Sequence, residues 1–372
     1  MKYYVIAGEA SGDLHGANLI KELKAVDPQA SIRCWGGDLM QAAGGHLVKH
    51  YKELAFMGFL EVFTNIATIF KNISFCKEDI HEFQPDVLIF IDYSGFNLRI
   101  AKWAKKEGFK TSYYIAPQIW ASREGRIEKI KSTIDNMYVT LPFEKEFYEK
   151  KHQYKVHFVG HPLIDAVENY PKIDSLSFKK EYDLSLNKPI IALLPGSRKQ
   201  EVSKMLLVML SVAQDFPDYQ FVIAGAPSLD EEFYTPFLKN TNIGLIFNKT
   251  YEILQVAHAA LVTSGTATLE TALFKVPQVV CYKGSWISYQ IAKRIITLKY
   301  ISLVNLIMDR ELVKELIQEN LTTHNLKTEL SHILDPSKRK TLLENYDLLE
   351  EKLGGSGASK NTAQLIYQQL KA

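Results

Sequence analysis

Residues 1–13 of the chain read MKYYVIAGEASGD. A short run of apolar, β-prone residues leads directly into a glycine-containing turn, which is typical of a strand that enters a helix. Gly8 and Gly12 let the backbone turn tightly and approach a ligand, and Ser11 and Asp13 are residue types that cap the following helix. The spacing lacks the Gly-x-Gly-x-x-Gly pattern of dinucleotide-binding proteins, so we do not expect NAD binding.

The same pattern of a strand and then a helix recurs along the whole chain. It restarts after a polar, charged stretch at 168–188, which predicts two Rossmann-like α/β domains, each with a parallel sheet, facing an inter-domain cleft. We expect these domains at 1–168 and 169–345. A helical tail at 346–372, which contains a Gly/Ser-rich hinge at 354–359, would pack back on the first domain or be exchanged in a dimer. The expected strands are 3–7, 31–35, 87–91, 111–115, 137–140, 190–194, 220–224, 244–247, 260–262 and 278–281.

Length and composition restrict the class of protein. A chain of 372 residues is too long for one ordinary core. Its net charge of +2 does not indicate a nucleic-acid binder. Three widely spaced cysteines indicate neither a disulfide framework nor a thiolate metal site. The first apolar run is shorter than a secretory signal needs, and polar residues interrupt the apolar region at 54–76, so we expect a cytoplasmic protein that crosses no membrane.

The second half begins like the first, with IIALLPGSR at 190–198. A glycine turn after a strand presents backbone N–H groups, the Ser197 hydroxyl and the Arg198 guanidinium, which suit the oxygens of a diphosphate. No Gly-Lys-Ser/Thr follows Gly196, so this is not a Walker loop. An exposed salt bridge is the alternative interpretation of Arg198.

A second turn of small residues, SGTATLE at 264–270, follows a later strand and begins a helix. The helix N-terminus, Ser264, Gly265 and Thr266 would offer donors to phosphates. Glu270 lies about one turn farther on, where a carboxylate can accept both hydroxyls of a ribose. Together the two turns predict a nucleotide-sugar site, although each alone is also common in capped helices.

In the first half, Asp92 comes directly after a strand, where parallel sheets bind their ligands. A carboxylate there could act as a general base, and an Asx turn is the alternative. Glu9 has a similar position after the first strand and could hold a sugar hydroxyl. His161 also follows a predicted strand, and a structural role for it is equally compatible with the sequence.

Two pairs of histidines have a four-residue spacing, His46 with His50 and His157 with His161. Neither pair has the Glu of a His-Glu-x-x-His motif, and the second is predicted to lie on a strand and turn rather than on one helical face. We therefore expect no metal site and no cofactor.

Apolar residues recur every three or four positions between 56 and 73, which marks one helical face. A face of this kind usually packs in a core, but the surface is wider than packing on one sheet requires, so part of it could contact lipid. Residues 99–131 contain nine Lys or Arg against three Glu, which would attract an anionic membrane surface. We assign Phe56, Met57, Phe59 and Ser11 to the acceptor and membrane side.

These motifs together resemble the lipid-A-disaccharide synthase family over nearly the whole chain. The matching segments are AGEASGD at 7–13, ELAFMG at 53–58, PQIWA at 117–121, LPFE at 141–144, GHP at 160–162, LLPGSR at 193–198, SGTATLE at 264–270 and SLVNL at 302–306. The resemblance implies the GT-B fold and an inverting transfer of 2,3-diacylglucosamine from UDP to the 6-hydroxyl of 2,3-diacylglucosamine 1-phosphate.

The resemblance also assigns roles to individual residues. Asp92 matches the proposed base, Glu9 an essential carboxylate, and Arg198, Glu270 and Asn305 the UDP-binding side. The chain departs from the family at Ser94, where Pro is usual, and at Ser122, where Trp is usual. Some members of the family exchange C-terminal segments in a dimer, so we expect a possible homodimer. The apolar face and the basic residues together favour an enzyme that works at a bilayer surface, so we also expect a peripheral protein of the inner membrane.

Two other functions remain compatible with the sequence. A UDP-N-acetylglucosamine 2-epimerase would bind the same nucleotide on the same fold, but it needs no apolar helix for a lipid acceptor. A non-catalytic nucleotide-sugar-binding protein would have no use for Asp92 and Glu9.

Overall fold

The computed structural model describes residues 1–54, 66–239, 241–284 and 299–371. It divides into two compact units, residues 1–165 with 353–372, and residues 166–352. The chain leaves the first unit within helix α8 (Pro162–Glu168) and re-enters it directly after helix α17 (Pro336–Lys352). The expected start of the tail, residue 346, lies inside α17.

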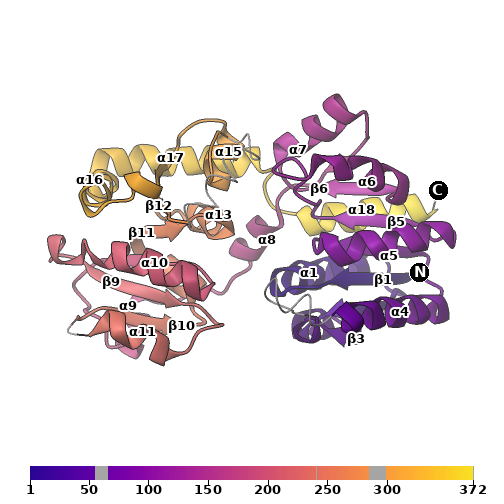
Figure 1. Cartoon of the computed structure of the whole chain (residues 1–372), viewed down its shortest axis with the longest axis horizontal. Helices are drawn as coiled ribbons and strands as arrows, with labels where there is room; N and C mark the ends of the chain where they lie inside the picture. The colour runs from indigo at the N-terminus through magenta and orange to yellow at the C-terminus, as the bar shows by residue number, and fades with distance from the viewer. Residues whose placement is uncertain (55–65, 240, 285–298, 372) are drawn as a thin grey trace. The chain divides into compact units, whose positions relative to one another are not determined.

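The first unit is built on a parallel sheet with the strand order β3-β2-β1-β4-β5-β6-β7 (Figure 1). Every neighbouring pair of these strands runs parallel. The strands are β1 (Lys2–Ala7), β2 (Ser31–Gly36), β3 (His46–His50), β4 (Val87–Ile91), β5 (Thr111–Tyr114), β6 (Asn136–Val139) and β7 (His157–Phe158).

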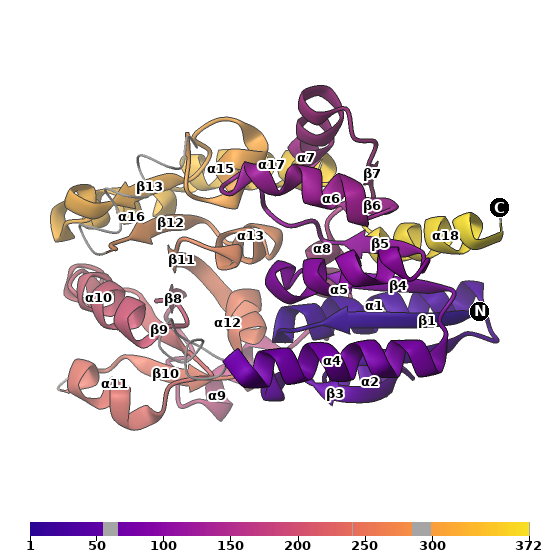
Figure 2. The same ribbon diagram turned by 45° about the vertical axis from the view of Figure 1, so that its right-hand side comes forward.

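Helices cover both faces of this sheet because both faces of its central strands are apolar. Tyr3 and Val5 of β1 lie in the core beneath α1 and the C-terminal helix α18, and Tyr4 and Ile6 lie in the core beneath α4, α5 and α6. Figure 2 shows α5 between α4 and α6. The described α-helices of this unit, besides α8, are α1 (Ala10–Val26), α2 (Asp38–Ala42), α4 (Ile66–Phe83), α5 (Ser94–Lys106), α6 (Ile127–Thr133), α7 (Pro142–Glu146) and α18 (Ala358–Lys371).

The second unit has a parallel sheet with the order β10-β9-β8-β11-β12-β13. Its strands are β8 (Ile190–Leu194), β9 (Gln220–Gly225), β10 (Gly244–Phe247), β11 (Ala257–Thr263), β12 (Gln278–Tyr282) and β13 (Lys314–Ile317). Its helices, besides α17, are α9 (Ser175–Glu181), α10 (Lys199–Leu210), α11 (Glu231–Leu238), α12 (Thr250–Val256), α13 (Thr266–Leu273), α15 (Leu303–Met308) and α16 (Thr323–Leu334).

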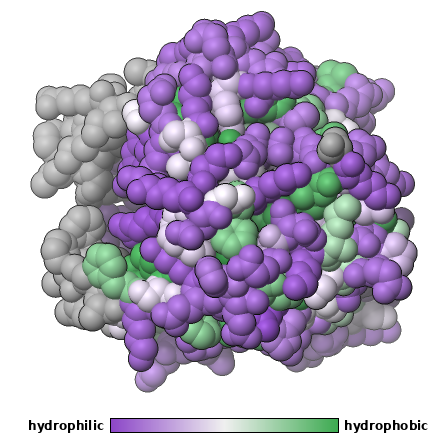
Figure 3. Space-filling model, turned by 90° about the vertical axis from the view of Figure 1, so that its right-hand side faces the viewer, coloured by the Kyte–Doolittle hydropathy of each residue, from purple (hydrophilic) through white to green (hydrophobic). Residues whose placement is uncertain are grey.

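The strand order reverses once in each sheet, between β1 and β4 in the first unit and between β8 and β11 in the second. Ligands of open α/β sheets bind beyond the carboxyl ends of the strands at such a switch point. The turns that the sequence singles out follow these four strands. The opposite face of the first unit, which carries both chain termini, is mainly hydrophilic (Figure 3).

All ten strands expected from the sequence are present, and the prediction of two parallel-sheet α/β domains is confirmed. Outside these ten, the sheets contain β7, which matches the strand expected before His161, and β3 and β13, which the sequence did not predict. Both are edge strands with charged or histidine side chains, HLVKH and KELI, so neither has the apolar run of a central strand.

Candidate functional site

A pocket of about 330 Å³ lies at the carboxyl ends of β8, β9 and β11 in the second unit. Six of the residues that we predicted to bind a UDP-sugar line it: Gly196, Ser197, Ser264, Gly265, Thr266 and Glu270. The sequence did not assign the other polar lining residues, Glu201, Thr250 and Thr263, or the turn at 225–227 to the site. That turn lies at the end of β9, so it could have been predicted from its position after an expected strand.

The first turn requires its glycine. Gly196 has a φ of +108°, in the left-handed region that other residues rarely adopt. A Cβ there would lie 2.2 Å from Oε2 of Glu201. The same carboxylate oxygen accepts a hydrogen bond from the backbone N–H of Ser197 at 3.3 Å. The carboxylate of Glu201 therefore lies against the turn whose N–H groups would bind a diphosphate.

The second turn leads into α13, which begins at Thr266. No side chain caps this helix, and Gly265 precedes it with a φ of +156°. The first N–H groups of a helix have no partner within the helix, and the helix dipole adds positive charge at this end. Since Gly265 and Thr266 line the pocket, these donors are available to an anion bound there.

Glu270 lies one turn into α13, and its Oε1 accepts a hydrogen bond from the hydroxyl of Tyr251 at 2.8 Å. Burial raises the pKa of Glu270, and the Tyr251 hydrogen bond opposes that rise. Tyr251 comes from α12 and packs edge-on against Tyr170 and Phe274. Nothing in the sequence indicated that Tyr251 fixes the orientation of this carboxylate.

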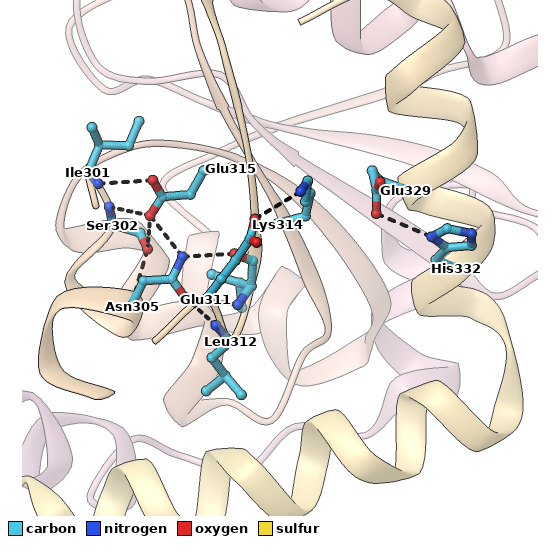
Figure 4. Close-up of polar contacts among 10 residues, drawn as sticks. Ile301, Ser302, Asn305, Glu311, Leu312, Lys314, Glu315, Glu329 and His332 are labelled. Atoms are coloured by element: carbon cyan, nitrogen blue, oxygen red, sulfur yellow. Dashed lines mark hydrogen bonds and ion pairs between the residues drawn. The ribbon is translucent and has the colours of Figure 1, made fainter. Parts of the chain in front are cut away.

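Ser264 connects the pocket to the segment that precedes α15. Its hydroxyl donates to the carbonyl oxygen of Ile301 at 2.9 Å. Figure 4 shows the carboxylate of Glu315, from β13, facing that segment. The Glu315 carboxylate accepts from the backbone N–H of Ile301 at 3.0 Å and from the N–H and hydroxyl of Ser302 at 2.9 and 2.8 Å. Glu315 thus fixes the backbone that holds Ser264.

Asn305 is fully buried, and its side chain is used within the same network (Figure 4). Its amide nitrogen donates to Glu315 at 2.9 Å and to the carbonyl of Val313 at 2.8 Å, and its oxygen accepts from the N–H groups of Leu312 and Val313. Asn305 and Arg198 are the two predicted nucleotide residues that do not line the pocket. Arg198 is exposed and immediately precedes α10.

In the first unit, Glu9 follows β1 and Asp92 follows β4, so the two carboxylates lie at adjacent strand ends beside the switch point. Solvent reaches both residues. Desolvation by the surrounding protein, together with the negative charge of Glu9, raises the pKa of Asp92. The structure therefore places the two predicted catalytic carboxylates so that the charge of Glu9 acts on Asp92.

The backbone at Asp92 is held in an unusual conformation. Asp92 and Tyr93 have φ values of +44° and +42°, which cost energy in residues other than glycine. The hydroxyl of Tyr113 and the amide of Asn97 both donate to the carbonyl oxygen of Asp92. A Cβ on Gly8 would lie 2.3 Å from the Tyr93 ring, so glycine is required there for the two strand ends to approach.

The structure corrects the capping role expected of Asp13. Its carboxylate accepts from the backbone N–H groups of Gly37, Leu39 and Met40, so it caps α2 rather than its own helix α1, which has no side-chain cap. Ser11 is exposed in the first turn of α1. The other residues assigned to the acceptor and membrane side, Phe56, Met57 and Phe59, lie outside the described residues.

Three of the paired histidines lie on strands, and the fourth, His161, is buried. His46 and His50 lie at the two ends of strand β3, where four residues span about 13 Å. His161 is buried, and burial lowers its pKa to about 3. The residues that the structure describes contain no group of three or more His, Cys, Asp or Glu that could hold a metal ion.

Comparison with protein families gives a match over almost the entire chain. A family model described as lipid-A-disaccharide synthetase matches residues 3–367. The lipid-A-disaccharide synthase of Geobacter metallireducens is 38% identical, with 98% of this chain and 96% of that protein covered. The enzyme of the same name from Coxiella burnetii is 38% identical, with 98% and 97% covered.

Solved structures are similar in fold at much lower identity. The UDP-N-acetylglucosamine 2-epimerase of Neisseria meningitidis, bound to UDP-GlcNAc, has a TM-score of 0.66 at 15% identity and covers 100% of this chain and 99% of its own. A putative epimerase from Listeria monocytogenes has a TM-score of 0.71 at 12% identity, with 100% and 96% covered. At these identities the likeness shows the GT-B fold alone.

Proposed function

The chain belongs to the lipid-A-disaccharide synthetase family of glycosyltransferases, and from this premise we propose the reaction and the residues that perform it. The enzyme transfers 2,3-diacylglucosamine from its UDP conjugate to the 6-hydroxyl of 2,3-diacylglucosamine 1-phosphate. The products are UDP and a β-1,6-linked disaccharide 1-phosphate. The substrates are thus a nucleotide sugar and a lipid-linked sugar.

The observation that carries the donor side is the pocket at the ends of β8 and β11. Its two turns offer backbone N–H groups, the Thr266 hydroxyl and a helix N-terminus to the diphosphate, while Glu270 accepts the ribose hydroxyls. Departing UDP gains negative charge as the glycosidic bond breaks, and donors fixed in advance stabilise that charge without reorganisation. Arg198, exposed beside the first turn, would add its charge from the pocket rim.

On the acceptor side, Asp92 takes the proton of the 6-hydroxyl as that oxygen attacks the anomeric carbon. A carboxylate with a raised pKa is a stronger base, so the charge of Glu9 increases the proton affinity of Asp92. The left-handed backbone at Asp92 and the donors on its carbonyl oxygen keep the side chain at the edge of the sheet. Glu9 holds a hydroxyl of the acceptor sugar in this scheme.

The rival function as a 2-epimerase shares the fold and the nucleotide. The similarity to epimerases lies between 12% and 15% identity in the structures compared, whereas the synthases are 38% identical over nearly the full chain. Family membership therefore favours the synthase. A non-catalytic binding protein would not need the carboxylate of Asp92 or the strained backbone that holds it.

The reaction is tested with UDP-diacylglucosamine and diacylglucosamine 1-phosphate, by detecting UDP and a tetraacyl disaccharide. Asp92→Asn keeps the shape of the side chain but removes the base, so turnover should fall by roughly 10²-fold or more while UDP binds as in wild type. Asp218→Asn, an exposed change in the second unit, is the matched control. Near-normal turnover of Asp92→Asn would exclude its role as the base.

We further propose that the enzyme works on the cytoplasmic face of the membrane without crossing it. None of the described helices is long and apolar enough to span a membrane. Phe70 of α4, on the apolar face expected from the sequence, is 64% exposed, whereas Ile73 of the same face is buried in the core. Phe75, which lies outside that face, is 43% exposed. Large exposed aromatic side chains on one helix favour contact with a lipid surface.

Phe70→Ser tests the membrane proposal. Its flotation with vesicles that contain anionic lipid should be weaker than that of wild type, because less apolar surface enters the interface. Leu207→Ser, at a 62% exposed position on α10, is the control for loss of an exposed apolar side chain. Unchanged flotation of Phe70→Ser would contradict a lipid contact at α4.

The tail also supports a proposal about assembly. Helix α18 packs on α1 after a hinge in which Gly354, Gly355 and Gly357 have positive φ. If the hinge opened, the tail of a second copy could make the same contacts, giving an exchanged homodimer. Light scattering of the purified protein measures whether a dimer forms, and a monomer at all concentrations would refute the proposal.

A further inference from the structure

Four cationic side chains gather on the adjacent helices α5 and α6 of the first unit. Arg99 and Lys102 lie on α5, Arg126 immediately precedes α6, and Lys129 lies in its first turn. The two helices are in contact. Burial lowers the pKa of Lys129, and the positive charges of Arg99, Lys102 and Arg126 lower it further. The other three positive charges are therefore close enough to act on Lys129 across the contact between the two helices.

The described part of the chain provides no counter-ion for this cluster. Other cations of the same region do have one, since Lys105 pairs with Asp135 and Lys151 with Glu124. None of the four cluster residues forms an ion pair among the described residues. Unneutralised like charges that repel one another destabilise the folded protein, so the cluster favours an anionic ligand.

The cluster begins beside the proposed base. Nη1 of Arg126 donates to the hydroxyl of Ser94 at 3.3 Å, two residues after Asp92. Ser94 stands where the family usually has Pro, and that hydroxyl is what makes the contact possible. On α5, the charge of Arg99 acts on Tyr93, the residue next to Asp92, where it opposes the rise in pKa that burial causes.

We propose that Arg99, Lys102, Arg126 and Lys129 bind the phosphomonoester of the acceptor lipid while Asp92 engages its 6-hydroxyl. This inference rests on the proposed function and goes beyond it, because it explains how the enzyme selects a phosphorylated acceptor. A phosphomonoester carries up to two negative charges and three acceptor oxygens, which match a cluster of guanidinium and ammonium donors. Bound at the 1-position, it lies one sugar ring away from the hydroxyl that reacts.

The same cations could instead bind phosphate groups of membrane lipids. The two kinds of phosphate site would have different effects on the enzyme. A site for the acceptor's phosphate determines which acceptor reacts, even in neutral detergent. A site for lipid headgroups determines how much protein binds to vesicles and leaves the choice of acceptor unchanged.

The experiment compares kcat/KM for diacylglucosamine 1-phosphate with kcat/KM for the same sugar without its phosphate, in neutral detergent micelles. Wild type should prefer the phosphorylated acceptor by about 10- to 100-fold, the fold-change that one or two charge-assisted hydrogen bonds give. Arg99→Gln and Arg126→Gln should lower that ratio about tenfold or more, with the KM for the donor unchanged. Lys106→Gln, an exposed residue at the far end of α5, should keep the wild-type ratio.

Each outcome decides the question. If both arginine variants keep the full preference for the phosphorylated acceptor, the proposal is wrong. If they keep that preference but no longer float with vesicles of anionic lipid, the cluster binds headgroups and the proposal is also wrong. If wild type forms no disaccharide from either acceptor, the proposed function itself fails, a result that differs from a loss of selectivity.

Discussion

Replacing Glu315 by Gln tests whether the network beside the pocket controls the nucleotide site. The carboxylate accepts four hydrogen bonds at 2.8–3.0 Å, from Ile301, from both donors of Ser302 and from Asn305. Gln has a similar shape, but one of its two terminal atoms is a donor. An NH₂ group in place of Oε2 would face the backbone N–H of Ile301, which then has no acceptor there.

The expected magnitude follows from these contacts. Hydrogen bonds to a charged acceptor contribute about 1.5–3 kcal/mol each, and a buried donor left without an acceptor costs a similar amount. Glu315 is only partly buried, so water replaces some of the loss. We expect the free energy of unfolding of the second unit to fall by about 2–3 kcal/mol. Because the Ile301 carbonyl holds Ser264, UDP should bind about fivefold more weakly, equivalent to about 1 kcal/mol.

Urea unfolding followed by circular dichroism gives the change in stability, and calorimetric titration with UDP gives the change in Kd. Glu329→Gln is a suitable control, since Glu329 contacts only His332 of its own helix within Figure 4. That change should alter stability by less than about 0.5 kcal/mol. If Glu315→Gln matched wild type in both stability and UDP affinity, the positioning role argued for this network would be refuted.

Two further predictions concern pH. Glu9→Gln removes the negative charge that raises the pKa of Asp92, so the acid limb of the profile of kcat/KM against pH should move to lower pH; an unmoved limb would mean that another group is the base. Burial raises the pKa of Glu144 from 4.5 to about 7, so the folded state binds more protons than the unfolded state in that interval, and stability should fall as pH rises from about 4.5 to 7. Glu144→Gln should reduce the change in the free energy of unfolding between pH 4.5 and 7 by up to about 3 kcal/mol, as measured by urea unfolding at several pH values. If the variant kept the pH dependence of wild type, groups other than Glu144 would be its cause.

The sequence predicted the architecture well because the central strands are continuous apolar runs that end in glycine or polar turns. The same regularity located Asp92 and the turns at Gly196 and Gly265, since a residue directly after a parallel strand lies at the ligand edge. Six residues predicted from such turns line one pocket. The local sequence pattern was therefore sufficient to predict those site residues whose role depends on their position directly after a strand.

The sequence could not predict partners that are distant along the chain. Asp13 has the residue type and position of a local cap, yet its three acceptor contacts are with residues 24 to 27 positions away. Tyr251 orients Glu270 from another helix. Glu315 lies on the edge strand β13, whose residues lack the apolar run by which a strand is predicted. Asn305 matches a family motif, but only the structure shows that its amide is used entirely within the protein scaffold.

The C-terminal helix has a consequence for synthesis on the ribosome. The first unit is completed by α18, whose Ala363 and Ile366 lie in the same core as α1. Residues 166–352 must be translated between the two parts of that core, which takes roughly 10–40 s at about 5–20 residues per second. During this time the apolar side of α1 has no cover, whereas the second unit is continuous in sequence and can fold as it emerges. The nascent chain therefore finishes its first domain last, and a message truncated before codon 353 would produce a protein whose N-terminal domain never closes its core.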